Sequence, residues 1–213
     1  ATIPRQLPLQ PLYWVAFISL ESLKLLMIAS PLFFPNIRPQ PIAFPPVVDL
    51  EDLLDPFQRF GVNLGLERIR HLLDRLGNPQ NRVPIIHVAG SNGKGSVCTY
   101  LYHILWQAGY RVGCYTSPHL VSWCERIQFC GDYITPTELR DVLTETIAAI
   151  DGTAPMPTLF EIMTAAAWLY FAEQNADLVV MEVGLGGRLD ATNVAHETLA
   201  TVITSISREH WQV

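Results

Sequence analysis

The chain has 213 residues, 49% of them hydrophobic, and a formal net charge of −6 at pH 7. This length and apolar fraction are sufficient for the core of one large domain. The negative charge and the lack of any run of Lys and Arg exclude a nucleic-acid-binding face. The four cysteines show no C-x-x-C spacing, which predicts reduced thiols in a cytoplasmic protein, with a disulfide as the alternative. We expect a monomer, although the sequence does not fix the oligomeric state.

Residues 1–46 differ in composition from the rest of the chain. They hold nine of the sixteen prolines, and their apolar stretch from Leu12 to Phe34 is interrupted by Glu21 and Lys24. Each charge at the centre of a membrane span costs about 2.5–3.5 kcal/mol, so a span is not expected. We predict an N-terminal extension outside the core fold, followed by a domain over residues 47–213. A membrane-associated helix and a segment that packs onto the domain are the alternatives.

From residue 50 onward, the apolar spacing alternates between that of helices and that of strands. Gly77 and Gly109 follow the first two predicted helices as stop signals. Capping-box patterns beginning at Thr135 and Thr158 open the last two helices. In chain order we expect a helix over 66–76, a strand over 85–89, a helix over 94–108, a strand over 111–116, a hairpin of 126–129 with 133–134, helices over 136–150 and 158–171, and strands over 177–183 and 199–206.

This order of elements predicts an α/β fold with a doubly wound, mostly parallel sheet and a small antiparallel hairpin. The last two predicted strands are nearly all apolar, as expected for strands covered on both faces. Ligands of such sheets bind beyond the carboxyl ends of the strands. Ser117, Glu182 and His210 would all lie there, together with the glycine-rich turn that follows residue 89.

That turn has the composition of a phosphate-binding loop. It reads Gly90-Ser91-Asn92-Gly93-Lys94-Gly95-Ser96, between a predicted strand and a predicted helix. The glycines allow successive N–H groups to point at an anion, the helix N-terminus adds its positive dipole end, and Lys94 supplies a cation. The loop departs from the common G-x-x-x-x-G-K-[ST] pattern, because Val88 takes the place of the first glycine and Gly95 separates Lys94 from Ser96. The alternative is a glycine-rich turn that only begins a helix.

The variant G-[ST]-N-G-K-G-[ST] resembles the phosphate loop of a group of ATP-dependent amide ligases. This group includes folylpolyglutamate synthase, dihydrofolate synthase and, more distantly, the Mur ligases of cell-wall synthesis. Further blocks resemble the folate branch in the same order, and the resemblance covers about residues 50–213. These blocks are Gly65–Arg68, Thr116–Leu120, Glu125–Ile127, Thr158–Glu161, Glu182–Asn193 and Ser207–His210.

The resemblance implies an ATP-dependent ligase that adds L-glutamate to dihydropteroate or (tetrahydro)folate through an acyl phosphate. It also implies a partial Mur-ligase-like central domain that stops before a C-terminal domain, so residues 1–213 alone are expected to be inactive. A Mur-type peptidoglycan-precursor ligase and a non-catalytic nucleotide-binding fragment are the alternatives. Whether the parent acts as dihydrofolate synthase, folylpolyglutamate synthase or both is not decided by the sequence.

The same resemblance assigns the nucleotide and metal site. It gives ATP to residues 90–96, and Mg²⁺ to Ser117, Glu182 and His210. Lys94, Glu182 and His210 are the implied catalytic residues. A carboxylate at the end of a buried strand is costly unless it is paired, which agrees with a cation beside Glu182. His210 is the weakest of the metal ligands, because magnesium prefers oxygen and a lone His is more often structural.

The implied pterin or folate contacts come from three separate segments. Glu161 also fits a helix-capping role, which is compatible with substrate contact. Arg188 and Asp190 could instead form a loop ion pair that contributes little. The implied substrate residues are Val62, Asn63, Leu64, Thr158, Leu159, Phe160, Glu161, Leu189, Asp190 and Ala191.

Overall fold

The structure is a computed structural model that describes residues 14–17, 44–58, 61 and 63–207. Its helices are α2 (Glu51–Gln58), α3 (Glu67–Arg75), α4 (Lys94–Gln107), α5 (Pro136–Ala148) and α6 (Leu159–Glu173), with 3₁₀ turns η1 (Pro79–Asn81) and η2 (Trp123–Arg126). Its strands are β1 (Trp14–Phe17), β2 (Ile85–Ala89), β3 (Val112–Tyr115), β4 (Ile127–Phe129), β5 (Asp132–Tyr133), β6 (Leu178–Glu182) and β7 (Thr198–Ile203).

The seven strands found in the described part of the chain form one sheet in the order β1-β7-β2-β6-β3-β4-β5. The pairs from β1 to β3 are all parallel, and only the β3–β4 and β4–β5 pairs are antiparallel. The predicted α/β class, the mostly parallel sheet and the small hairpin are therefore confirmed. Each predicted helix and strand is present, with ends that differ by no more than three residues.

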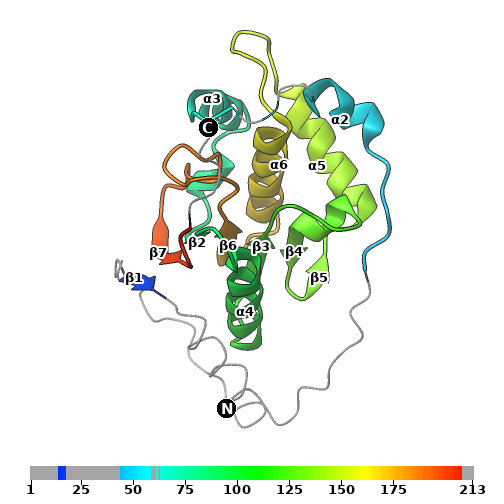
Figure 1. Cartoon of the computed structure of the whole chain (residues 1–213). Coiled ribbons are helices and arrows are strands. Elements are labelled where there is room, and N and C mark those ends of the chain that lie inside the picture. Colours follow the sequence, from blue (N-terminus) through cyan, green and yellow to red (C-terminus); the bar gives the residue numbers. More distant parts are fainter. Residues whose placement is uncertain (1–13, 18–43, 59–60, 62, 208–213) are drawn as a thin grey trace.

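Helices cover the two faces of the sheet, and Figure 1 shows the strands between α4 and the group formed by α2, α5 and α6. The alternation along β6 explains the two layers. Val179 and Met181 pack in the cluster with α6, whereas Leu178 and Val180 pack in the cluster with α4. Because successive side chains of a strand point to opposite faces, an uninterrupted apolar strand serves both layers.

Helix α6 is the central helix of its layer, since its residues from Glu161 to Ala172 are all buried. Both predicted capping boxes are formed. The Thr158 hydroxyl accepts from Glu161 N and the Glu161 carboxylate accepts from Thr158 N, and Thr135 and Glu138 do the same at the start of α5. These caps fix where the two helices begin and bring the first turn of α6 to the carboxyl ends of the strands.

Three features differ from the sequence prediction. Helix α2 was not predicted, because Pro56 within it resembles a helix breaker. The expected strand 199–206 ends at Ile203, after which the chain turns along the phosphate loop. Strand β1 lies within the predicted extension 1–46 and pairs with β7, while the boundary at residue 46 remains a prediction. Among the described residues, no helix is long and apolar enough to cross a membrane.

Candidate functional site

The glycine-rich loop connects β2 to α4, as the sequence indicates. Gly90 has φ +138° and Gly93 has φ +84°, which are backbone conformations that favour glycine. A Cβ atom on Gly90 would also lie 2.0 Å from Thr204 Oγ1. Only glycine therefore lets the loop approach the segment after β7 this closely.

Lys94 bends back over the loop that it follows. Its Nζ donates to the carbonyl oxygens of Gly90, at 2.9 Å, and of Ser91, at 3.4 Å. Beside it lies a cavity of about 400 Å³ whose wall includes Gly90, Ser91 and Lys94. Residues 92, 93, 95 and 96 complete the loop and the first turn of α4. The arrangement places one cation and a helix N-terminus at a cavity large enough for a phosphate chain.

The segment after β7 holds the other side of this loop. Ser91 N donates to Ser205 O at 2.7 Å, and Thr204 N donates to Ala89 O at 2.9 Å. The Ser91 hydroxyl accepts from Ser207 N at 3.0 Å and donates to Ser207 O at 3.2 Å. Sequence reasoning missed this contact, because it placed 204–206 in a strand.

Glu182 and Ser117, two of the three predicted metal ligands, are adjacent. Glu182 ends β6 with 5% of its surface exposed, and its Oε2 accepts from Ser117 N at 3.0 Å. Burial raises the pKa of the Glu182 carboxyl, while the Ser117 N–H and the Lys94 charge act in the opposite direction. His210 lies outside the described residues. Within the described part of the chain, no group of three His, Cys, Asp or Glu side chains is placed to hold a metal.

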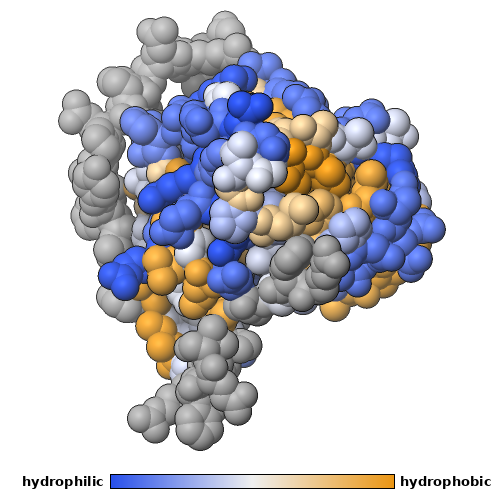
Figure 2. Space-filling model, turned by 90° about the horizontal axis from the view of Figure 1, so that it is seen from above, coloured by the Kyte–Doolittle hydropathy of each residue, from blue (hydrophilic) through white to orange (hydrophobic). Residues whose placement is uncertain are grey.

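A second cavity, of about 460 Å³, adjoins the first and shares Leu64, Gly184 and Leu185 with it. Every predicted substrate residue within the described part of the chain lines it, and Val62 lies outside that part. Figure 2 shows the molecule from the top of the view in Figure 1. On this face, exposed apolar residues are bordered by hydrophilic ones. The predicted residues on the wall are Asn63, Leu64, Thr158, Leu159, Phe160, Glu161, Leu189, Asp190 and Ala191.

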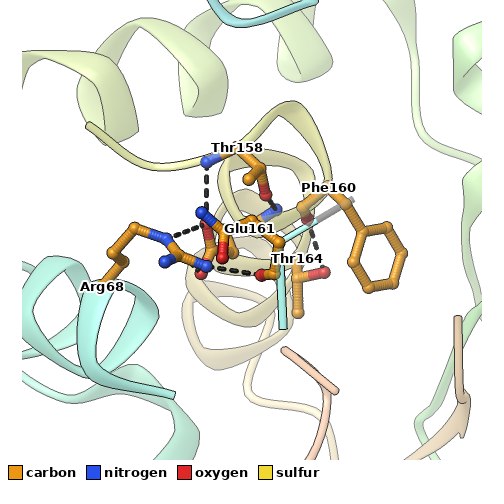
Figure 3. Close-up of polar contacts among 6 residues, drawn as sticks. Arg68, Thr158, Phe160, Glu161 and Thr164 are labelled. Carbon is orange, nitrogen blue, oxygen red and sulfur yellow. Dashed lines mark hydrogen bonds and ion pairs between the residues drawn. The ribbon is translucent and has the colours of Figure 1, made fainter. Parts of the chain in front are cut away.

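Glu161 has a structural partner that sequence reasoning did not identify. Its carboxylate accepts from Arg68 Nε at 3.0 and 3.1 Å and from Thr158 N at 2.7 Å, as Figure 3 shows. Arg68 also donates from Nη2 to Asn63 O at 2.5 Å. One arginine thus joins α3, the loop containing Asn63 and the first turn of α6. The sequence did contain a signal for Arg68, because this residue ends the Gly65–Arg68 block that resembles the ligases.

Asp190 is a buried side chain that organises the loop after β6. Its Oδ2 accepts from Leu185 N at 2.7 Å, and its Oδ1 accepts from Thr192 N at 3.0 Å and from Thr192 Oγ1 at 2.5 Å. Within the described residues it forms no ion pair with Arg188, so that alternative was wrong. A carboxylate satisfied by backbone N–H groups instead fixes the shape of the cavity wall.

Arg126 also lines the second cavity. It belongs to the Glu125–Ile127 block, but sequence reasoning assigned no role to its side chain. Its Nε donates to His119 Nδ1 at 2.9 Å, and its guanidinium lies 4.7 Å from the centre of the Trp123 ring. Burial lowers the pKa of His119, and the Arg126 charge lowers it further. A neutral His119 can accept the bond, so a cation is held at this wall.

The fold and these two cavities define an α/β domain with a glycine-rich loop of the phosphate-binding type and a second cavity beside that loop. No protein-family model matches the chain. The dihydrofolate synthase/folylpolyglutamate synthase of Bacillus subtilis is 46% identical over 160 residues, which cover 73% of this chain and 37% of the relative.

Solved structures agree with this similarity. A folylpolyglutamate synthase of Mycobacterium tuberculosis complexed with ADP is 40% identical, with a TM-score of 0.70 over 76% of this chain and 37% of that one. Escherichia coli FolC in complex with DHPP and ADP is 38% identical, with a TM-score of 0.67 over 76% of this chain and 38% of that one. The chain is thus similar in sequence and structure to dihydrofolate synthase/folylpolyglutamate synthases, and it spans somewhat more than a third of the length of these relatives.

Proposed function

We propose that this chain supplies the nucleotide site and the acid-substrate site of an ATP-dependent ligase that adds L-glutamate to dihydropteroate or a folate. The observation that carries the proposal is the position of the described substrate residues. Three segments far apart in the sequence meet on the wall of one cavity, and that cavity adjoins the phosphate loop. The relatives named above, one of them complexed with ADP and another with DHPP and ADP, support it.

The proposed chemistry is a transfer of the terminal phosphoryl group of ATP to a substrate carboxylate. The amine of glutamate then displaces phosphate from the acyl phosphate and forms the amide. Such transfers depend mostly on positioning and on neutralisation of charge. Lys94 would neutralise phosphate charge, and the shared wall at Gly184 and Leu185 would bring the substrate carboxylate close to the nucleotide.

The donor chemistry at Glu182 fits magnesium. Among the described residues, the buried Glu182 carboxylate accepts one hydrogen bond, from Ser117 N, and Ser117 carries a hydroxyl oxygen of its own. Hard oxygen ligands and retained waters are what magnesium prefers. The ion would neutralise phosphate charge when bound, and Glu182 and Ser117 are proposed to hold it. His210 remains a proposed ligand on the strength of the resemblance.

The second cavity suits a flat aromatic acid. Phe57, Leu64, Phe160 and Leu189 provide apolar walls, whereas Arg126 and Asp190 add side chains of opposite charge to the lining. Aromatic ligands are typically held between such apolar surfaces, with a few polar groups fixing their orientation. Dihydropteroate has this combination of a planar ring system and a carboxylate. The cytoplasmic location and the monomeric state stay predictions.

Lys94→Ala tests the nucleotide part of the proposal. Its affinity for Mg·ADP, measured by isothermal titration calorimetry, is expected to fall about tenfold or more while the fold is retained, because a charge-assisted contact is lost. Arg75→Gln removes an equal charge from a half-exposed side chain on α3 and serves as the control. Unchanged affinity in folded Lys94→Ala would contradict the assignment.

A further inference from the structure

A chain of three buried side chains joins the core strand β2 to the wall of the acid-substrate cavity. His87 Nε2 lies 2.8 Å from Thr192 Oγ1, and Thr192 Oγ1 lies 2.5 Å from Asp190 Oδ1. The three residues are 6%, 0% and 3% exposed. His87 and Thr192 do not line either cavity, so any effect on a ligand passes through Asp190.

The direction of the two hydrogen bonds follows from the donors available. An ionised Asp190 only accepts, so the Thr192 hydroxyl donates to it. The Thr192 oxygen then accepts from His87, which must carry its proton on Nε2. Burial lowers the pKa of His87 although the Asp190 charge acts in the opposite direction, and the 2.8 Å contact places the Nε2–H toward Thr192. The histidine thus fixes the rotation of the hydroxyl, and the hydroxyl fixes the carboxylate.

The orientation of this carboxylate matters because its surroundings are tightly packed. Its second oxygen accepts from Leu185 N and thereby holds the Gly184–Leu185 segment that both cavities share. A Cβ atom on Gly184 would lie 2.5 Å from the Phe160 ring and 3.1 Å from Asp190 Oδ2. A rotated carboxylate would therefore displace the backbone or the aromatic wall of the cavity.

We propose that Thr192, oriented by His87, is a positioning residue that sets the Asp190 carboxylate and the 184–190 loop for the acid substrate. The inference rests on the proposed function, because it takes the second cavity as the site of a pterin-type acid. The phosphate loop holds nucleotide through its own backbone and Lys94, so nucleotide affinity should depend little on this relay.

The test compares Thr192→Val, which removes the hydroxyl at nearly constant shape, with Thr192→Ser, which keeps it. Thr146→Val is the matched control, since Thr146 is also fully buried and its hydroxyl donates to Val142 O within α5. Binding of dihydropteroate and of Mg·ADP to the full chain is measured by calorimetry. Loss of one hydrogen bond to a charged group predicts about a tenfold rise in the Kd of dihydropteroate for Thr192→Val. Thr192→Ser and Thr146→Val should stay within about threefold of the parent chain, as should Mg·ADP binding to every variant.

His87→Leu provides a second arm that does not depend on the folding of Thr192→Val. It should weaken dihydropteroate binding in the same direction, and His87→Leu/Thr192→Val should be no weaker than Thr192→Val alone, since both act through one contact. Equal losses for both ligands, additive losses in the double variant, or a tenfold loss in Thr146→Val would overturn the positioning role. Failure of the parent chain to bind dihydropteroate would instead overturn the proposed function, and the positioning role with it.

Discussion

The two cavities share a wall but are built in different ways. The proposed nucleotide cavity is lined by the 89–94 loop, residues 183–186, the end of β7 with the segment after it, and Leu64, and its loop wall is shaped by glycine conformations and by Lys94. The proposed acid-substrate cavity is assembled from residues 57, 58, 61 and 63–65, from residues 117, 118 and 126, from the start of α6 and from the 184–191 loop. Side-chain contacts over long sequence separations hold these parts together. A phosphate is recognised by dipoles that the backbone supplies, whereas a shaped organic substrate needs walls from several elements.

This difference predicts different sensitivities to mutation. In the loop, glycine positions should be the most sensitive, because no side chain can replace a backbone conformation. Around the second cavity, the residues that join separate segments should matter more than residues that only line the wall. Arg68 joins three segments and Asp190 joins both ends of one loop, so each loss would move several walls together.

Gly90→Ala should have the largest effect on the nucleotide side. The added Cβ would lie 2.0 Å from Thr204 Oγ1, at a φ of +138° that costs an L-residue about 1–3 kcal/mol. We expect the affinity for Mg·ADP to fall about a hundredfold, equivalent to about 2.7 kcal/mol, in calorimetric titrations. Gly152→Ala is the control, since Gly152 also has positive φ but open space around it. Similar losses in both variants would show a general effect of strain.

Arg68→Met should have the largest effect on the other side. Removing one partner of a buried ion pair leaves the Glu161 carboxylate uncompensated, which costs about 3–5 kcal/mol of unfolding free energy in denaturant titrations. Arg140→Met breaks the solvent-exposed pair with Asp52 and should change stability little. Equal destabilisation by the two variants would contradict a special role of Arg68.

Gly184→Ala tests the wall that the two cavities share. Its Cβ would lie 2.5 Å from the Phe160 ring, so the ring or the loop must move. Overpacking of this kind typically costs about 1–3 kcal/mol. We expect the Kd of dihydropteroate to rise about tenfold and that of Mg·ADP to rise less, both measured by calorimetry. A loss of affinity for Mg·ADP alone would contradict the role of this wall in binding dihydropteroate.

Ser91→Ala should have the smallest effect. It removes the two hydrogen bonds between the Ser91 hydroxyl and the Ser207 backbone, which are exposed to solvent. The backbone bond from Ser91 N to Ser205 O remains. Nucleotide affinity in the same titration should therefore fall by no more than about threefold. A tenfold loss would mean that side chains hold this loop as firmly as they hold the second cavity.

The same contrast explains which parts could be predicted from the sequence. Glycine spacing, helical periodicity and capping boxes act between near neighbours, so β2, the loop, α4 and the starts of α5 and α6 were predicted. The pairing of Arg68 with Glu161 spans 93 positions, and no local pattern indicates it. The contact of His87 with Thr192 spans 105 positions. In the sequence, His87 is only the one polar residue of an apolar strand, and nothing near it indicates its partner.

The resemblance to known ligases supplied what local physics could not. It named the residues of the second cavity, and those within the described part of the chain do line one cavity. It did not reveal how they are held. Arg126 lies in the Glu125–Ile127 block, but its contacts with His119 and Trp123, seven and three positions away, depend on the conformation of the segment between them, which the resemblance does not give.

The central claim is that nucleotide and acid substrate occupy separate, adjoining cavities. The most direct measurement titrates Lys94→Ala and Phe160→Ala, each with Mg·ADP and with dihydropteroate, by calorimetry. The account predicts a crossed result: Lys94→Ala loses nucleotide affinity about tenfold and keeps dihydropteroate, whereas Phe160→Ala loses dihydropteroate about tenfold and keeps nucleotide. Both variants losing the same ligand, or each losing both ligands equally while remaining folded, would contradict it.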